Sequence, residues 1–124
     1  MLLNFLAVGV GGFIGSCLRF AITKICGFYS VVFPFGTLLS NVIAGIAIGF
    51  IIGLDITSPK TKLFLTTGLL GGLSTFSAFS LETINLFNEG KHLLSSLNVL
   101  LNLTLSLIGV VLGMYLANLL FKKA

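Results

Sequence analysis

The sequence predicts an all-α membrane protein with four transmembrane helices, and three observations support this prediction. Hydrophobic residues make up 56% of the 124 residues and charged residues only 8%, whereas soluble domains carry about 25% charged residues. The mean hydropathy is +1.17. The apolar residues form four long runs, and one spanning helix needs about 20 residues. We therefore expect a single transmembrane domain at residues 1–124.

Each expected helix is bounded by polar or turn residues. The second connection contains Ser58 and Pro59, and the third contains Gly90, which are residues typical of turns. Because the connections are short, successive helices should be antiparallel neighbours. The four expected helices span about 2–26, 33–54, 61–87 and 93–121.

Small residues four positions apart line the first, second and fourth expected helices. Such faces let helix backbones approach closely, which is the main packing device when lipid removes the hydrophobic drive between helices. We therefore expect a tight bundle with a face for a second subunit. The small residues are Gly11 and Gly15, then Gly45, Gly49 and Gly53, and finally Gly109 and Gly113.

The expected third helix is interrupted by a stretch of Gly and hydroxyl residues between Gly68 and Ser80. Lipid offers no partner for freed backbone groups, so irregular backbone at bilayer depth persists only where it is buried in protein or lines a cavity. Carbonyl groups that end the first half-helix suit a cation, and N–H groups that open the second half favour an anion. We expect the third helix to be broken at the midplane, beside an ion site.

Polar but uncharged side chains lie on the expected second and fourth helices. Asn41 follows Thr37 by one turn on the glycine face of the second helix, and Asn98, Asn102 and Ser106 recur on one face of the fourth. A path for a cation or proton would carry Asp, Glu or His, whereas a row of neutral donors suits a small anion. Hydrogen bonds between packed helices are the alternative explanation.

Two Phe residues follow the predicted break. Phe76 and Phe79 lie on one face of the second half-helix, and Phe rings carry positive edges that can face an anion; the alternative is that both fill a core. Arg19 and Glu82 fall near expected helix ends, where snorkelling or a salt bridge accounts for them. A role of Arg19 in attracting or gating an anion stays open.

Positive charges are almost balanced between the two sides of the expected bundle. Four Lys on one side face three Lys or Arg on the other, so the positive-inside rule gives only a small preference for both termini in the cytoplasm. An antiparallel dimer of oppositely inserted copies is therefore an alternative to a fixed orientation. The residues counted are Lys60, Lys62, Lys122 and Lys123 on one side and Arg19, Lys24 and Lys91 on the other.

Three motifs, in their order along the chain, resemble those of the Fluc/CrcB family of small bacterial fluoride channels. They are GGFIGSCLR at residues 11–19, PFGTLLSN at 34–41 and GGLSTFSAF at 71–79. With the fourth segment, the resemblance covers essentially the whole chain. It implies a dual-topology dimer with two pores in the bacterial cell membrane, which lets fluoride leave the cell and excludes chloride.

The resemblance also implies roles for single residues. Phe76 and Phe79 would be the pore phenylalanines, and Asn41 would donate to fluoride. Carbonyl groups of Gly71 and Ser74 would hold a structural Na⁺ that is not transported. On the fourth helix, Asn102 and Ser106 would form a polar track with Asn98 at its entrance, and Thr37, Ser77 and Arg19 are further candidates for the pore or its vestibule.

Some positions depart from the family pattern. Ala78 stands where a Thr is common, and Asn98 and Asn102 stand where Tyr or Ser is expected. The departures leave open whether the dimer contains two identical chains or a paralogous partner.

Other functional classes are less compatible with the sequence. A small multidrug exporter needs a membrane-embedded Glu in its first helix, which this chain lacks. A non-transporting membrane subunit would explain the glycine faces but not the break with its Phe pair. There is no His, Cys, Asp and Glu cluster, no Ser-His pair and no phosphate-binding loop, so we do not expect an enzyme.

Overall fold

The computed structural model describes residues 1–121, and all its regular structure is helical. Four helices are long and apolar enough to cross a membrane, which confirms the predicted all-α fold with four membrane-spanning helices. The third crossing, Pro59–Asn88, comprises several consecutive pieces. The elements are α1 (Leu2–Tyr29), α2 (Phe35–Gly53), α3 (Pro59–Leu63), η1 (Phe64–Leu70), α4 (Gly71–Leu73), α5 (Phe76–Asn88) and α6 (His92–Phe121).

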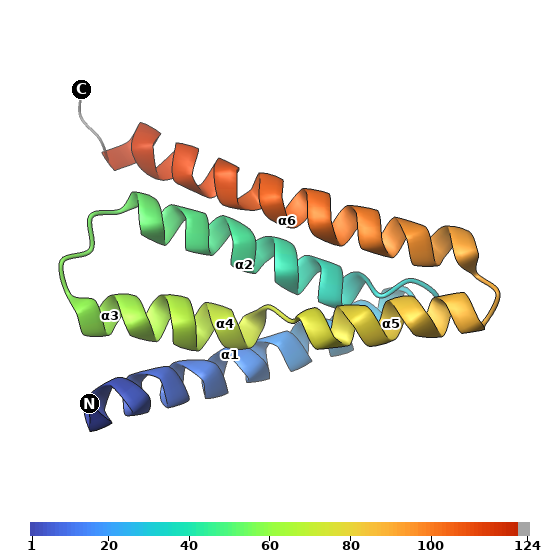
Figure 1. Cartoon of the computed structure of the whole chain (residues 1–124), viewed down its shortest axis with the longest axis horizontal. Helices are drawn as coiled ribbons and strands as arrows, with labels where there is room; N and C mark the ends of the chain where they lie inside the picture. The colour runs from blue at the N-terminus through green and yellow to red at the C-terminus, as the bar shows by residue number, and fades with distance from the viewer. Residues whose placement is uncertain (122–124) are drawn as a thin grey trace.

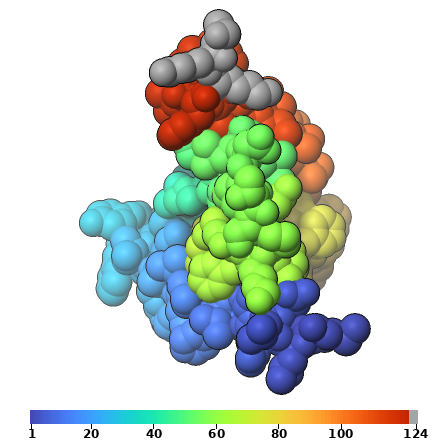
Figure 2. Space-filling view, turned by 90° about the vertical axis from the view of Figure 1, so that its left-hand side faces the viewer, coloured from blue at the N-terminus to red at the C-terminus, as the bar shows by residue number. Residues whose placement is uncertain are grey.

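The helices cross back and forth as the short connections predict. In Figure 1, α2 lies beside α6, the third crossing lies on the other side of α2, and α1 packs against α3 and α4. Met1 and the last turn of α6 are at the same end of the bundle. Figure 2 shows α1 and α6 at opposite ends of the cross-section, with α2 and the third crossing between them. Of the Lys residues used for the charge balance, Lys122 and Lys123 lie outside the described residues.

The predicted glycine faces are the places where helix backbones approach each other. A Cβ atom added to Gly45 would lie 2.8 Å from the Ser106 carbonyl oxygen of α6, and Gly49 and Gly113 meet the facing backbone even more closely. A side chain at these positions would force α2 and α6 apart. The small residues therefore set the spacing of this pair, as the sequence predicted.

A second close approach joins α1 to the third crossing. Gly11 and Gly15 of α1 lie directly against the backbone of η1, and a Cβ atom on Gly72 would lie 2.5 Å from the Gly12 carbonyl oxygen. The segment η1 is a π-helix, which the sequence did not predict. Short π-helical segments inside α-helices are uncommon and recur at functional sites.

Most large apolar side chains face outward rather than into a core. Within one subunit the buried hydrophobic residues are few, and Leu70 and Leu73 pack with Ala44 where α2 meets the third crossing. Only 11% of the 18 most apolar consecutive residues of α1 are buried inside the chain. This distribution is the one that a helix bundle shows when lipid or another subunit covers it.

Candidate functional site

The third crossing is broken at Ser74 and Thr75, near its middle. Both residues are extended, with φ and ψ of −77° and 152° at Ser74 and of −152° and 122° at Thr75. The Thr75 side chain then caps α5, because its hydroxyl accepts a hydrogen bond of 3.2 Å from the Ala78 N–H. The break that the sequence predicted between Gly68 and Ser80 is therefore two residues long.

The break leaves four backbone carbonyls without helical donors, those of residues 71–74, because the first N–H groups of α5 have no partner within a helix. In a continuous helix the N–H of Thr75 would bond to Gly71 and that of Ala78 would bond to Ser74. Instead, the Thr75 N–H donates to Asn41 Oδ1 at 2.7 Å, and the Ala78 N–H donates to the Thr75 hydroxyl. Gly71 and Ser74, whose carbonyls the family resemblance implies as cation ligands, are two of these four.

Arg19 of α1 also contacts the break. Its Nε donates to the Gly72 carbonyl oxygen at 3.1 Å, which satisfies one more of the carbonyls at the end of α4. Arg19 lies ten residues before Tyr29, the last residue of α1, so the expectation that it lies near a helix end is wrong. Its guanidinium binds the broken backbone instead of snorkelling to the membrane surface.

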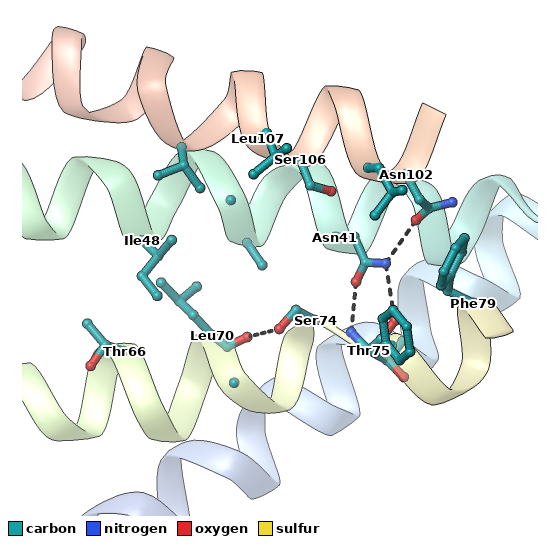
Figure 3. A pocket seen from close by; sticks show the side chains of 16 residues that line it. Asn41, Ile48, Thr66, Leu70, Ser74, Thr75, Phe79, Asn102, Ser106 and Leu107 are labelled. Atoms are coloured by element: carbon teal, nitrogen blue, oxygen red, sulfur yellow. Dashed lines mark hydrogen bonds between the residues drawn. The ribbon is translucent and has the colours of Figure 1, made fainter. Parts of the chain in front are cut away.

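Asn41 joins α2 to the break and to α6. Besides accepting from Thr75, its Nδ2 donates to the Thr75 carbonyl oxygen at 3.2 Å and to Asn102 Oδ1 at 2.9 Å. Figure 3 shows Asn41 reaching from α2 toward both partners. The hydrogen bonds between packed helices that the sequence allowed for Asn41 are therefore formed.

The predicted polar face of α6 continues this set of contacts into the protein. Asn102 Nδ2 donates to Asn98 Oδ1 at 2.9 Å and to the Asn98 carbonyl oxygen at 3.0 Å. Asn98 is fully buried and donates to the Thr83 hydroxyl at 2.9 Å. Sequence reasoning did not select Thr83, although its four-residue spacing from Phe79 places it on the same face of α5 as that ring.

The two Phe rings form a pair at the start of α5. Their centroids are 5.4 Å apart and their planes are inclined by 56°. Phe79 is 6% exposed, whereas Phe76 is 75% exposed. One ring therefore belongs to the interior of the subunit, and the other projects from it.

A groove of about 420 Å³ brings most of the predicted site residues together. Figure 3 looks into it and shows Ser106 and Asn102 on α6 facing Ser74 and Thr75 across Asn41. Asn98 is buried behind Asn102 and does not line the groove. The predicted residues that line it are Asn41, Gly71, Ser74, Phe76, Phe79, Asn102 and Ser106.

The remaining candidates lie outside the groove. Thr37 lines a separate pocket of about 430 Å³ together with Glu82, and its hydroxyl donates to Glu82 Oε1 at 2.6 Å. Glu82 lies in the middle of α5 and six residues before Asn88, where the third crossing ends, close to its expected place. The Ser77 hydroxyl shares a hydrogen bond of 3.3 Å with Thr75.

The fold and the groove define a class, namely small multi-pass membrane proteins whose neutral polar side chains meet at a broken helix inside the bilayer. Broken helices of this kind form ion sites in channels and transporters. Among residues 1–121, no three His, Cys, Asp or Glu side chains lie together as metal ligands would.

Comparison with known proteins identifies the family. The sequence model of the CrcB-like protein family, Camphor Resistance (CrcB), matches residues 6–114, and the chain belongs to this family. It is 48% identical over 119 residues to the fluoride-specific ion channel FluC of Clostridium novyi (strain NT), covering 92% of this chain and 93% of the relative. The resemblance that the motifs predicted is thus confirmed.

Other FluC proteins are similar to the chain over most of their length. The fluoride-specific ion channel FluC of Clostridium perfringens (strain 13 / Type A) is 45% identical over 125 residues, covering 97% of this chain and 98% of the relative. That of Pyrococcus abyssi (strain GE5 / Orsay) is 43% identical over 113 residues, covering 88% of this chain and 91% of the relative. The family consists of membrane channels and not of enzymes, as the sequence predicted.

Proposed function

We propose that this chain is a fluoride-specific ion channel that lets fluoride leave the cell down its gradient and so lowers its toxicity. The observation that carries the proposal is the groove in which the Phe pair, the amides of Asn41 and Asn102 and the Ser106 hydroxyl meet at the break. Among residues 1–121, no Lys or Arg lines this groove. A permeating ion must bind strongly enough to enter and weakly enough to leave, and neutral donors with ring edges meet both demands for an anion.

The conducting unit that we propose is a dimer of two antiparallel copies with two pores, inserted in the cell membrane. Phe76 is 75% exposed although it borders the groove, and Gly71 at the break is exposed as well. A second copy packed across this face would complete the wall that one chain leaves open. A paralogous chain in place of the second copy is the alternative.

The broken end of α4 fits a resident Na⁺ between the two copies. Carbonyl oxygens of unwound helices are the usual ligands of Na⁺ in membrane proteins, and Gly71 and Ser74 have lost the helical donors to their carbonyls. When bound, the ion would supply a fixed positive charge at the subunit interface. In this proposal it is structural and is not transported.

Efflux from liposomes tests the proposal directly. The purified protein is reconstituted with internal potassium fluoride, and a potassium ionophore balances the charge that leaves. We expect rapid fluoride release at a fluoride electrode, and no release of chloride from matched liposomes loaded with potassium chloride. Equal release of both anions, or no release above protein-free liposomes, would refute a fluoride channel formed by this chain alone. Release only after co-reconstitution with a paralogue would establish the heterodimer.

A further inference from the structure

The half-buried Asn41 and the buried Asn102 and Asn98 form a relay, in which each side-chain amide donates to the oxygen of the next. The relay begins at the backbone N–H of Thr75, which donates to Asn41 Oδ1 at 2.7 Å. Asn41 Nδ2 donates to Asn102 Oδ1, and Asn102 Nδ2 donates to Asn98 Oδ1, each at 2.9 Å. Because a backbone N–H can only donate, it fixes the orientation of Asn41 and, through it, that of the next two amides.

Thr83 fixes the other end of the relay. Asn98 Nδ2 donates to the Thr83 hydroxyl at 2.9 Å, and that hydroxyl donates to the Phe79 carbonyl oxygen at 2.8 Å. A hydroxyl has one proton, so once it is used on Phe79 the oxygen can only accept from Asn98. No amide between Thr75 and Thr83 can then flip without bringing two donors or two acceptors together.

In this orientation, the amide protons beside the groove are already used in hydrogen bonds within the protein. An amide NH₂ group has two protons. Those of Asn41 go to the Thr75 carbonyl and to Asn102, and those of Asn102 go to the carbonyl and side-chain oxygens of Asn98. An anion therefore gains an Asn41 proton only by replacing the Asn102 oxygen or the Thr75 carbonyl oxygen. A compact anion such as fluoride accepts hydrogen bonds more strongly than chloride and competes better for that proton.

We propose that Thr83 is a positioning residue that sets anion selectivity through this relay. The inference rests on the proposed function, since it concerns which anion the groove admits. Without the Thr83 acceptor, the Asn98 amide loses the partner that holds it, and the hydrogen bonds that follow one another from Asn41 through Asn102 to Asn98 are weakened. The Asn102 oxygen would then be displaced from the Asn41 proton more easily, so that a weaker acceptor such as chloride could also take its place.

Three single variants test the role of the Thr83 hydroxyl. Thr83→Val keeps the shape but removes the acceptor, whereas Thr83→Ser keeps the hydroxyl. Thr104→Val is the matched control, because the Thr104 hydroxyl also bonds to a carbonyl four residues earlier (2.6 Å to Leu100) but lies exposed and contacts no amide. If Thr83→Val does not fold, Thr83→Cys replaces it, since sulfur is a weak acceptor.

Fluoride and chloride efflux are measured for each variant in the liposome assay. We expect Thr83→Val to lower the ratio of fluoride to chloride efflux by about three- to tenfold, the factor that one hydrogen bond provides. Thr83→Ser and Thr104→Val should keep the wild-type ratio. A ratio that Thr83→Val leaves unchanged, that Thr83→Ser lowers equally, or that Thr104→Val lowers equally overturns the proposal.

Side-chain amide exchange measured by NMR separates this proposal from the proposed function. On protein labelled with ¹⁵N-Asn in detergent micelles, the Asn98 NH₂ protons should exchange slowly in the wild type and in Thr83→Ser, and rapidly in Thr83→Val. If the wild type releases no fluoride but these exchange rates hold, the channel proposal fails while the relay stands. If Thr83→Val leaves the Asn98 exchange rate unchanged, the relay is overturned even in a conducting protein.

Discussion

Replacing Asn41 with Leu should destabilise the bundle and reduce fluoride flux, because Asn41 holds the break and lies on the groove. The variant loses three hydrogen bonds, two to the Thr75 backbone and one to Asn102. Hydrogen bonds between transmembrane helices average about 0.6 kcal/mol each, which gives about 2 kcal/mol for three. The Thr75 N–H left without a partner adds about 1–2 kcal/mol. We therefore expect a total loss of about 3–4 kcal/mol.

Two measurements check this expectation. Thermal unfolding in detergent should show a melting temperature lower by about 10 °C, since 1 kcal/mol corresponds to about 2–4 °C or more in chains of this size. Fluoride efflux should fall by at least about tenfold if Asn41 donates to the ion, because hydrogen bonds to charged groups contribute about 1.5–3 kcal/mol. Asn118→Leu is the control, because Asn118 lies exposed on α6 and away from the groove. An unchanged melting temperature and flux in Asn41→Leu would refute both roles.

Three further predictions use the same assays. Phe76→Ile should lower fluoride flux strongly while the protein stays folded, since the ring borders the groove and is 75% exposed; Phe13→Ile on exposed α1 is the control, and equal flux in both variants would remove Phe76 from the pore. Gly49→Val should prevent close packing on Val110 and lower stability by about 2 kcal/mol or more, whereas Gly9→Val meets no atom within 4 Å and should unfold at the wild-type temperature. Replacing Na⁺ with a large organic cation should weaken dimer association, because a ligand bound only by the assembled state stabilises it by mass action; an unchanged dimer dissociation constant would exclude a Na⁺ site at the break.

The features that sequence alone predicts are those encoded by local spacing. Four apolar runs predict four crossings, and glycines four positions apart predict the close contact of Gly45 with α6. The break could also be predicted, because Gly71, Gly72, Ser74 and Thr75 lie within five residues and all favour a helix less than Ala or Leu. Helix ends were less predictable: α1 continues to Tyr29 and not to about residue 26, and Gly27 lies inside it.

The features that sequence did not predict depend on contacts between distant segments. Arg19 bonds to Gly72, which lies 53 positions further along the chain, and this pairing depends on the register between α1 and the third crossing. The π-helix η1 likewise lies where Gly68 meets the α1 backbone. Thr83 looked like an ordinary helix residue until the fold placed it opposite Asn98. Periodicity shows which face a residue occupies but not which residue lies opposite.

The site combines two requirements that one subunit meets only in part. Polar groups inside a bilayer must find partners within the protein, and the amides of Asn41, Asn98 and Asn102 satisfy one another without any charge. A conducting groove must also leave part of its wall available to the ion, and in the proposed dimer the second chain would keep lipid away from the exposed ring of Phe76 beside the buried ring of Phe79. Within one chain, the amides therefore hold the side chains beside the groove in fixed positions, whereas the ion's access to the groove depends on the face that a second copy would cover. A variant that separates the dimer should accordingly abolish flux while leaving the amide relay intact, and one that disrupts the relay should alter selectivity while the dimer persists.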